Sequence, residues 1–518
     1  MAHYFRCDDE NAIVETTCGK VKGYLWDDLT VFKGIPYATA KRFQKAVEPE
    51  PWEGVKDASN FGYVCPLLTK TKPNGELGVP HRYWISDEDC LNLNIWTPGC
   101  DSKKRPVIVW LHGGAYAFGS AIEHQAYDGD NLSRYGDFVV VTVNHRLNIL
   151  GYLDVSSLGP EYCHSANNGT LDLVMALKWI HTNISGFGGD PGNVTIFGQS
   201  GGGGKVAALM QTPAADGLYH KAVIMSGTVT HRFLGCEGDG TAIVEALTEH
   251  LNLASAKELA TVPHELLKIA YNEISVKLQE KGEYIGQAPL KDDDFSGFID
   301  EAPMRQETLD IPVMIGTVFG EFSAFVPAGA DRLHMSEDEA IEILKAELGE
   351  DGVREMLPLF RTAYPERPIY DLLCLDSQFR PDTQFFIKER ARAGAKIYSY
   401  LFCQDMNMDH GSVPAHCADV PYFFGNTDMV PQTQQEGVKE LEEKMLSALT
   451  AFAKTGKPDT DLLPAWPSST ADAEACMIFK DNCEVRVNHD RELIPLHQKY
   501  IVPYSQKIFQ IMMEKLQH

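Results

Sequence analysis

The chain lacks the features of membrane proteins and of zinc-binding proteins. None of its apolar runs approaches the length of a membrane-spanning helix, and the opening residues MAHYFRCDDE contain no apolar core of a secretory signal. The 12 cysteines are scattered without C-x-x-C pairs, so we expect no metal site. These absences favour a cytoplasmic protein with mostly reduced thiols and no membrane partner.

Positive charge is also scarce. The 518 residues include 46 Lys and Arg against 72 Asp and Glu, which gives a formal net charge of −26. This imbalance disfavours nucleic acid and anionic membranes as partners. Hydrophobic residues make up 44% of the chain, enough for a large packed core. A small-molecule substrate fits this composition, and the oligomeric state stays open.

Apolar runs alternate with helical patterns in the first half of the chain. Runs typical of buried parallel strands cover 107–111, 138–143, 194–197 and 222–225. Residues 171–184 carry the apolar stripe of a crossover helix. The alternation predicts an α/β fold with a large, mostly parallel sheet and helices on both faces. The first 36 residues predict antiparallel hairpin strands at one edge.

Two later segments interrupt this alternation. Residues 232–300 and 335–395 are helical and charged, and we expect them to form cap-like insertions. Sheet patterning returns at 312–316 and 396–402, and an amphipathic helix is predicted over 436–455. The chain has no internal repeat or linker, so we expect one catalytic domain over residues 1–518.

The most informative segment is VTIFGQSGGGGKV at residues 194–206. A buried strand passes through G-x-S-x-G into a helix, which predicts a nucleophile elbow with Ser200 at a strained turn. Gly198 and Gly202 would be required because side chains there collide across the turn. The alternative is a glycine-rich connection in which Ser200 only caps the helix. The four glycines at 201–204 favour function, because each costs about 1 kcal/mol relative to Ala in a helix.

A serine nucleophile needs a base, an orienting acid and donors for the oxyanion. In α/β-hydrolases the acid and the histidine follow the serine along the chain. The loop from His112 to Ala115, HGGA, directly follows a predicted strand. We assign the oxyanion donors to the N–H groups of Gly114, Ala115 and Gly201, and a simple Gly-Gly turn is the alternative.

Further motifs accompany the elbow and the HGGA loop in a fixed order. They are VFKGIPYA at 31–38, EDCLNLNIWTP at 88–98, the block 168–202, and AFAKTGKP at 451–458. With them the chain resembles the type-B carboxylesterase and cholinesterase family along nearly its whole length. The resemblance implies an α/β-hydrolase fold and a serine carboxylesterase that hydrolyses small-molecule esters, a reaction for which we expect no metal and no cofactor.

The resemblance also implies the other members of the catalytic triad. Glu321 lies in GTVFGE after a strand pattern and takes the place of the family's acid. His416 begins HCADVPYFFG, which matches the family's histidine motif, whereas the rival His410 lacks such a sequence after it. Ser226 resembles the serine that hydrogen-bonds the acid. Gln199 replaces the family's acidic residue before the nucleophile, which argues against a true cholinesterase.

The resemblance implies two internal ion pairs, Arg42 with Glu88 and Arg146 with Asp172. Cys65 and Cys90 occupy positions where secreted family members form a disulfide, and whether the bond forms here is left open.

The sequence specifies the substrate less closely than it specifies the reaction. From their adjacency to the catalytic loops, four aromatic residues are expected to line an apolar pocket: Tyr116, Phe118, Phe322 and Phe325. Hydrolysis of amides, carbamates or hydroxycinnamate-type aromatic esters is the alternative reaction on the same triad. A non-catalytic binding protein is disfavoured, because the chain keeps all three triad members. The natural substrate and the stereochemical preference do not follow from the sequence.

Overall fold

The computed structural model describes residues 4–7, 12–68, 81–228, 230–231, 237–322, 331–408 and 411–500. The chain forms two compact units. The first comprises Met1–Thr71, Arg82–Ile224 and Val229–Ile311, and the second comprises Lys72–His81, Met225–Thr228 and Pro312–His518. The single catalytic domain expected from the sequence stays a prediction.

The central strands of the first unit are buried and apolar. They are β8 (Arg105–Leu111), β9 (Val139–Val143), β10 (Gly189–Gln199) and β11 (Lys221–Met225). β8 pairs in parallel with both β9 and β10, as the continuous apolar runs predicted. The antiparallel strands β5 (Leu29–Pro36) and β7 (Asn92–Thr97) continue the sheet beyond β9. The strand order in this unit is β1-β4-β5-β7-β9-β8-β10-β11.

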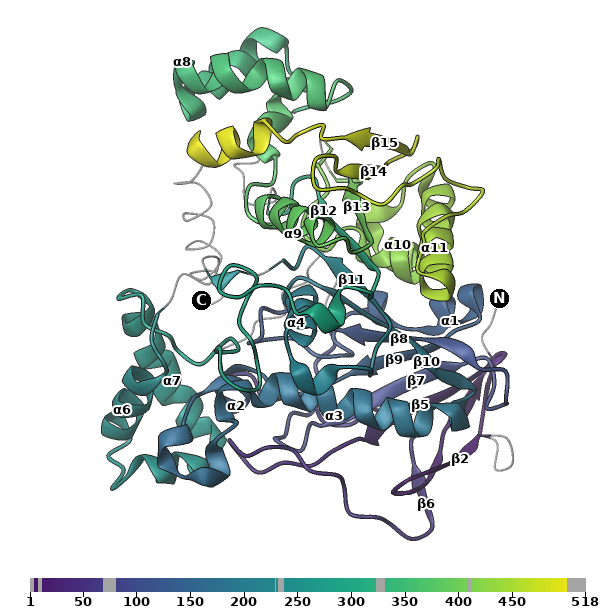
Figure 1. Cartoon of the computed structure of the whole chain (residues 1–518), viewed down its shortest axis with the longest axis vertical. Coiled ribbons are helices and arrows are strands. Elements are labelled where there is room, and N and C mark those ends of the chain that lie inside the picture. Colours follow the sequence, from purple (N-terminus) through teal and green to yellow (C-terminus); the bar gives the residue numbers. More distant parts are fainter. Residues whose placement is uncertain are drawn as a thin grey trace. The chain divides into compact units, whose positions relative to one another are not determined.

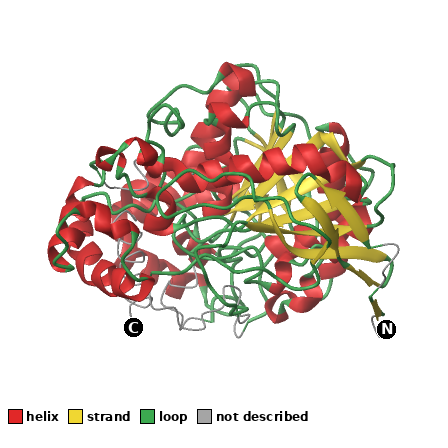
Figure 2. Ribbon diagram, turned by 90° about the horizontal axis from the view of Figure 1, so that it is seen from below, coloured by secondary structure: helices red, strands yellow, loops and turns green. Residues whose placement is uncertain are grey.

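The N-terminal strands differ in part from the expected edge hairpins. β1 (Phe5–Arg6) and β4 (Tyr24–Trp26) do extend the edge next to β5, and Figure 2 shows the short β1 beside the N-terminus. β2 (Ile13–Thr16) and β3 (Gly19–Lys22), however, form a separate three-stranded sheet with β6 (Val55–Asp57). The chain changes sheets at Gly23, where a Cβ would lie closer than 3.0 Å to the main-chain oxygen of Val31.

Helices flank the strands of the first unit. α3 (Asn168–Asn183) runs alongside them (Figure 1) and matches the predicted crossover helix. α4 (Gly201–Met210) begins directly after Ser200. The predicted helical segment 232–300 contains α6 (Thr241–His250) and α7 (His264–Gln279), which lie side by side (Figure 1). The short helices α1 (Asp130–Gly136) and α2 (Asn148–Tyr152) follow β8 and β9 in the chain.

In the described residues of the second unit, the strand order is β12-β13-β14-β15. β12 (Val313–Val318), β13 (Ile397–Phe402) and β14 (Ala475–Phe479) are parallel, and β15 (Glu484–Val487) is antiparallel to β14. Its helices are α8 (Glu337–Ala363), α9 (Arg380–Arg392), α10 (Val420–Phe424) and α11 (Val438–Thr455). The helices predicted at 335–395 and 436–455 are therefore present, and the role of the first segment as a cap stays a prediction.

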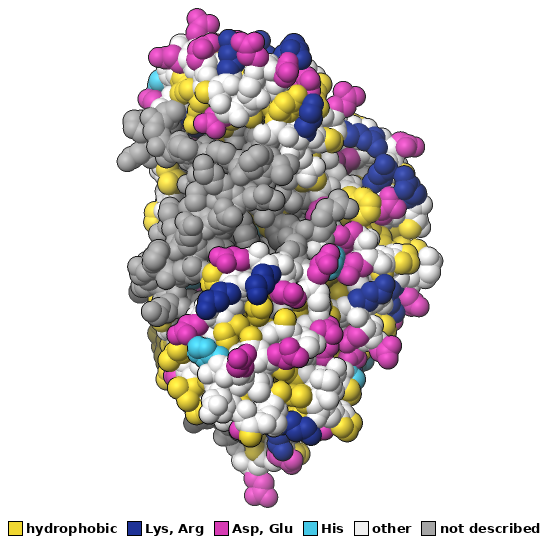
Figure 3. Space-filling model, turned by 90° about the vertical axis from the view of Figure 1, so that its left-hand side faces the viewer, with side chains coloured by type: hydrophobic (Ala, Val, Ile, Leu, Met, Phe, Trp, Pro, Cys, Tyr) yellow, Lys and Arg dark blue, Asp and Glu magenta, His cyan; other side chains and the backbone are white. Residues whose placement is uncertain are grey.

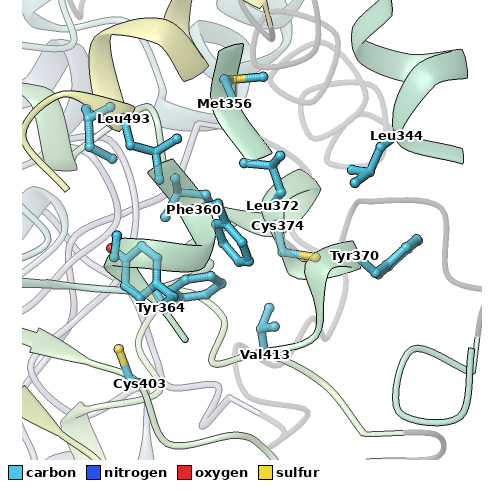
Figure 4. Packing of buried hydrophobic residues seen from close by; sticks show 14 of the residues in the cluster. Leu344, Met356, Phe360, Tyr364, Tyr370, Leu372, Cys374, Cys403, Val413 and Leu493 are labelled. Carbon is cyan, nitrogen blue, oxygen red and sulfur yellow. The ribbon is translucent and has the colours of Figure 1, made fainter. Parts of the chain in front are cut away.

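A hydrophobic core in the second unit supports the two loops that contain Glu321 and His416. Phe360 and Tyr364 of α8 and the loop residue Val413 belong to this cluster (Figure 4). Phe319 belongs to it as well, and its ring meets the Tyr364 ring edge-on at 5.0 Å between centroids. Since Phe319 precedes Glu321 by two residues and Val413 precedes His416 by three, the core fixes the start of both loops.

The α/β architecture predicted from the sequence is confirmed, with a mixed, mostly parallel set of strands and flanking helices. In the part of the chain that the structure describes, no helix combines the length and the apolar character needed to cross a bilayer.

Candidate active site

Ser200 occupies the sharp connection between β10 and α4. Its backbone angles are φ 57° and ψ −129°, a region that residues other than glycine rarely adopt. Ser200 is half-buried, whereas both of its neighbours, Gln199 and Gly201, are buried. The turn therefore has the strain and the exposure expected of a nucleophile elbow.

The two flanking glycines are required by close main-chain contacts. A Cβ at Gly198 would lie closer than 3.0 Å to the carbonyl group of Gly202, across the turn. A Cβ at Gly202 would come equally close to the main-chain oxygen of Leu111, at the end of β8. The first of these contacts is the collision that the sequence predicted, and the second joins the elbow to a different strand.

The predicted oxyanion loop lies next to the elbow. Gly114 and Ala115 both have left-handed backbones, with φ 90° and φ 54°. A Cβ at Gly201 would lie closer than 3.0 Å to the main-chain nitrogen of Ala115. A Cβ at Gly113 would lie 3.3 Å from the Cβ of Ser200. The structure thus gathers the main chain of the three proposed donor residues beside Ser200.

The buried Glu321 and the half-buried His416 form a pair in the second unit. His416 Nδ1 lies 2.5 Å from Glu321 Oε2, and the main-chain N–H of His416 donates to the main-chain oxygen of Glu321. The other carboxylate oxygen of Glu321 accepts a hydrogen bond of 2.9 Å from the Val318 N–H. A carboxylate at Nδ1 selects the tautomer in which Nε2 can act as a base.

Two aromatic rings pack against the imidazole, and their own centroids lie 5.9 Å apart. The Phe322 ring stacks on His416 at 4.9 Å between centroids, and the Phe379 ring stacks on it at 5.3 Å with an interplanar angle of 6°. Phe379 was not predicted from the sequence. Asp376 accepts hydrogen bonds from the main-chain N–H groups of Phe379 and Arg380, at 3.1 and 2.7 Å. The signal for this arrangement in the sequence is Asp376, which stands four residues before the first residue of α9.

Two buried carboxyl groups near this pair resist ionisation. Burial, assisted by the negative charge of Glu321, raises the pKa of both Asp376 and Asp419 to about 7. Asp419 accepts a hydrogen bond of 2.8 Å from the Tyr400 hydroxyl. At neutral pH these acids therefore carry less negative charge than ordinary carboxyls, so Glu321 faces less repulsion from them.

The hydrogen bond expected between Ser226 and Glu321 is not formed. Ser226 Oγ is buried and has no hydrogen-bond partner in the described part of the chain. Its N–H donates to the main-chain oxygen of Gly316 at 2.8 Å. The Ser226 backbone has φ 42°, and the two carboxylate oxygens of Glu321 take their bonds from Val318 and His416 instead.

The remaining predicted residues have different surroundings. Gln199 is buried, and its Oε1 lies 3.5 Å from the position of a Cβ at Gly113. Tyr116 is buried in a cluster with Tyr152 and Tyr284, which indicates a packing role more than a pocket lining. Phe118 is half-buried. Phe325 and His410 lie outside the described residues.

The two implied ion pairs are present. Arg42 Nε donates to both carboxylate oxygens of Glu88 at 3.0 and 3.1 Å, and Arg146 Nη2 lies 2.7 Å from Asp172 Oδ1. Cys65 and Cys90 are buried and both are free thiols.

Comparison with known proteins gives consistent results. The model of the carboxylesterase family matches residues 10–493. Para-nitrobenzyl esterase of Bacillus subtilis (strain 168) is 33% identical over 501 residues, which cover 93% of this chain and 96% of that protein. Phenmedipham hydrolase of Pseudarthrobacter oxydans is 32% identical, covering 90% and 95%.

A solved structure of an esterase from the anaerobe Clostridium hathewayi is more similar still. It is 49% identical with a TM-score of 0.93, covering 96% of this chain and 100% of that one, and it is described as able to hydrolyze aliphatic aromatic polyesters. The segment matched by the family model includes positions 200, 321 and 416.

Proposed function

Because this chain belongs to the carboxylesterase family and hydrolyses carboxylic esters, we propose that Ser200, Glu321 and His416 form its catalytic triad. The observation that carries this assignment is the strained backbone of Ser200 between β10 and α4. The pair of Glu321 and His416 supplies the oriented base that a serine nucleophile needs.

In the proposed reaction, His416 Nε2 takes the hydroxyl proton of Ser200 while Oγ attacks the ester carbonyl carbon. Glu321 holds the imidazole in its tautomer and stabilises the imidazolium that forms. His416 then gives the proton to the leaving alkoxide, and an alcohol departs. Water attacks the acyl-enzyme by the same route, which releases the carboxylic acid and restores Ser200.

The N–H groups of Gly114, Ala115 and Gly201 are proposed to stabilise the tetrahedral oxyanion. Their support is the close packing of the Gly201 main chain against Ala115, which aligns two parts of the chain that are distant in sequence. Losing one such donor reduces kcat by roughly 10²–10³ in comparable enzymes.

We further propose that this chain accepts esters with an aromatic ring. Phe322 and Phe379 place aromatic faces around His416, and aromatic groups favour stacked or edge-on contact with such rings. The esterase that is 49% identical is described as hydrolysing aliphatic aromatic polyesters. Turnover of bis(2-hydroxyethyl) terephthalate, compared with its saturated cyclohexane analogue, tests this preference.

Replacement of the nucleophile tests the reaction itself. We expect Ser200→Ala to lose at least about a thousandfold in kcat/KM on p-nitrophenyl esters of graded acyl length, because the covalent step is removed. The exposed Ser102 gives a matched control, and Ser102→Ala should retain full activity. Equal rates for Ser200→Ala and the native protein would refute the mechanism.

The cytoplasmic location expected from the sequence stays a proposal. Fractionation of the native host, with the protein followed by antibody, tests it.

A further inference from the structure

A lysine is buried on the helix that follows the nucleophile. Lys205 lies on α4, five residues after Ser200, and 1% of it is exposed. Lysine is rarely buried, because its ammonium group loses hydration. The acyl transfer proposed above uses no lysine, so the presence of Lys205 needs a different explanation.

The side chain of Lys205 ends on the oxyanion loop. Its Nζ donates a hydrogen bond of 3.0 Å to the main-chain oxygen of His112. In the part of the chain that the structure describes, this is the one hydrogen bond of the side chain. His112 is the first residue after β8 and begins the loop that ends at Ala115. The lysine therefore connects the nucleophile helix to the loop across 93 residues of sequence.

The first turn of α4 packs on the same piece of chain. A Cβ at Gly202 would lie closer than 3.0 Å to the main-chain oxygens of both Leu111 and His112. Residues three apart on a helix share a face, so Gly202 and Lys205 approach His112 from one side. Two contacts thus fix the peptide group that leads into the loop.

Several titratable groups interact with the charge of Lys205, and Arg146 is a second cation that acts on His145. Glu123, Cys65, His112 and His145 interact with it electrostatically. Burial lowers the pKa of Lys205 to about 7, against the opposing effect of the Glu123 charge. Burial and the Lys205 charge hold the pKa of His112 and of His145 well below the usual value. Both imidazoles are therefore neutral where the lysine still carries charge.

We propose that Lys205 is a positioning residue that holds the His112 carbonyl and thereby fixes the loop whose Gly114 and Ala115 N–H groups bind the oxyanion. This inference rests on the proposed function.

The physical reason is the rigidity of the peptide group. The His112 oxygen shares a plane with the Gly113 nitrogen, so a bond to that oxygen determines the direction in which the next residues leave β8. Glycines at 113 and 114 give the loop little conformational preference of its own. A misplacement of about 1 Å at a reacting group can reduce the rate on the order of 10²-fold.

The test replaces the lysine with methionine, which keeps the length of the stem and removes the donor. We expect Lys205→Met to lower kcat by about 10- to 100-fold with KM unchanged within twofold, because only the transition state is affected. The affinity for an alkyl trifluoromethyl ketone, which forms a tetrahedral adduct with the serine, should fall by the same factor as kcat.

Lys221 provides a matched control. It is a second buried lysine, at the start of β11, and its Nζ lies 2.5 Å from Asn193 Oδ1. Lys221→Met removes a comparable buried donor, so it can lower the melting temperature but should leave kcat and the ketone affinity unchanged.

The outcomes separate the two proposals. If Ser200→Ala is inactive while Lys205→Met keeps kcat and ketone affinity within twofold of the native enzyme, the positioning role is overturned and the triad stands. Equal losses of kcat and ketone affinity in Lys221→Met would also overturn it, because any buried lysine would then suffice. If Ser200→Ala stays active, the triad itself fails.

Discussion

Ser200 and His416 owe their orientation to different kinds of neighbour. Main-chain groups surround the serine, since Gly198, Gly202 and the loop from His112 approach without side chains. Side chains contact the histidine, with Glu321 at one nitrogen and the rings of Phe322 and Phe379 packed against the imidazole. Substitutions should therefore disturb the serine through sterics and the histidine through lost contacts.

Asp419 gives a prediction about stability and pH. Burial raises its pKa in the folded protein to about 7, from the usual 3.8. The unfolded chain therefore loses this proton at lower pH than the folded protein does. The stabilisation is complete below about pH 4, declines as the pH rises, and is gone above about pH 7. The slope is about 1.4 kcal/mol per pH unit between those limits.

We expect Asp419→Asn to gain stability relative to the native protein as the pH rises from 5 to 7.5, because the amide has no proton to lose. Thermal unfolding at several pH values measures the difference in stability between the variant and the native protein. Asp101→Asn is the control, since hydrogen bonding to Arg105 lowers the pKa of Asp101 to about 2. The difference in stability between this variant and the native protein should be constant over the same pH range. A difference in stability between Asp419→Asn and the native protein that does not change with pH would contradict the prediction.

At the scale of elements, the junction of β10 and α4 depends on the end of β8. Gly202 contacts the Leu111 oxygen, Gly201 contacts Ala115, and Lys205 bonds to His112. The elbow is therefore a joint between one helix and two neighbouring parallel strands, rather than a local turn alone.

Gly202→Ala tests this joint. We expect at least about a hundredfold loss of kcat and a lower melting temperature, because the added methyl group meets main-chain oxygens that cannot move independently. Gly192→Ala on β10 is the control, since the nearest atom is the side-chain oxygen of Asp190 at 3.3 Å. Circular dichroism establishes whether each variant folds, and native activity in a folded Gly202→Ala enzyme would contradict the expectation.

At the scale of the whole molecule, 72 acidic residues outnumber 46 basic ones. On the described part of the face in Figure 3, acidic side chains are interspersed with basic ones. The net charge of −26 therefore acts at long range as a repulsive field for anions more than as a local binding patch.

This field predicts a salt dependence that varies with the charge of the ester. We expect kcat/KM for an anionic ester, p-nitrophenyl hemiglutarate, to rise about threefold or more between 0.01 and 0.15 M salt, as the screening length falls from about 30 to 8 Å. The neutral p-nitrophenyl valerate should change by less than twofold. Parallel salt curves for the two esters would argue against long-range repulsion.

The order of strands and helices was predictable because each central strand is buried on both faces and reads as an apolar run. The runs at 107–111 and 194–197 both lie within observed strands. The N-terminal strands β2 and β3 were placed in the wrong sheet, since short half-buried strands fit several partners equally well. The pairing of β3 with β6 joins segments about 35 residues apart, which a local pattern does not specify.

By itself the sequence determined the alternating architecture, the strained serine between strand and helix, and the residues of the proposed triad, because these depend on local periodicity, glycine placement and recognisable motifs. Only the tertiary structure decided that Phe379 stacks on His416, that Ser226 leaves Glu321 to other donors, and that Lys205 bonds to His112. The contacts of Phe379 with His416 and of Lys205 with His112 join residues tens of positions apart. Their geometry is set by packing across the core rather than by the residues next to them in the chain.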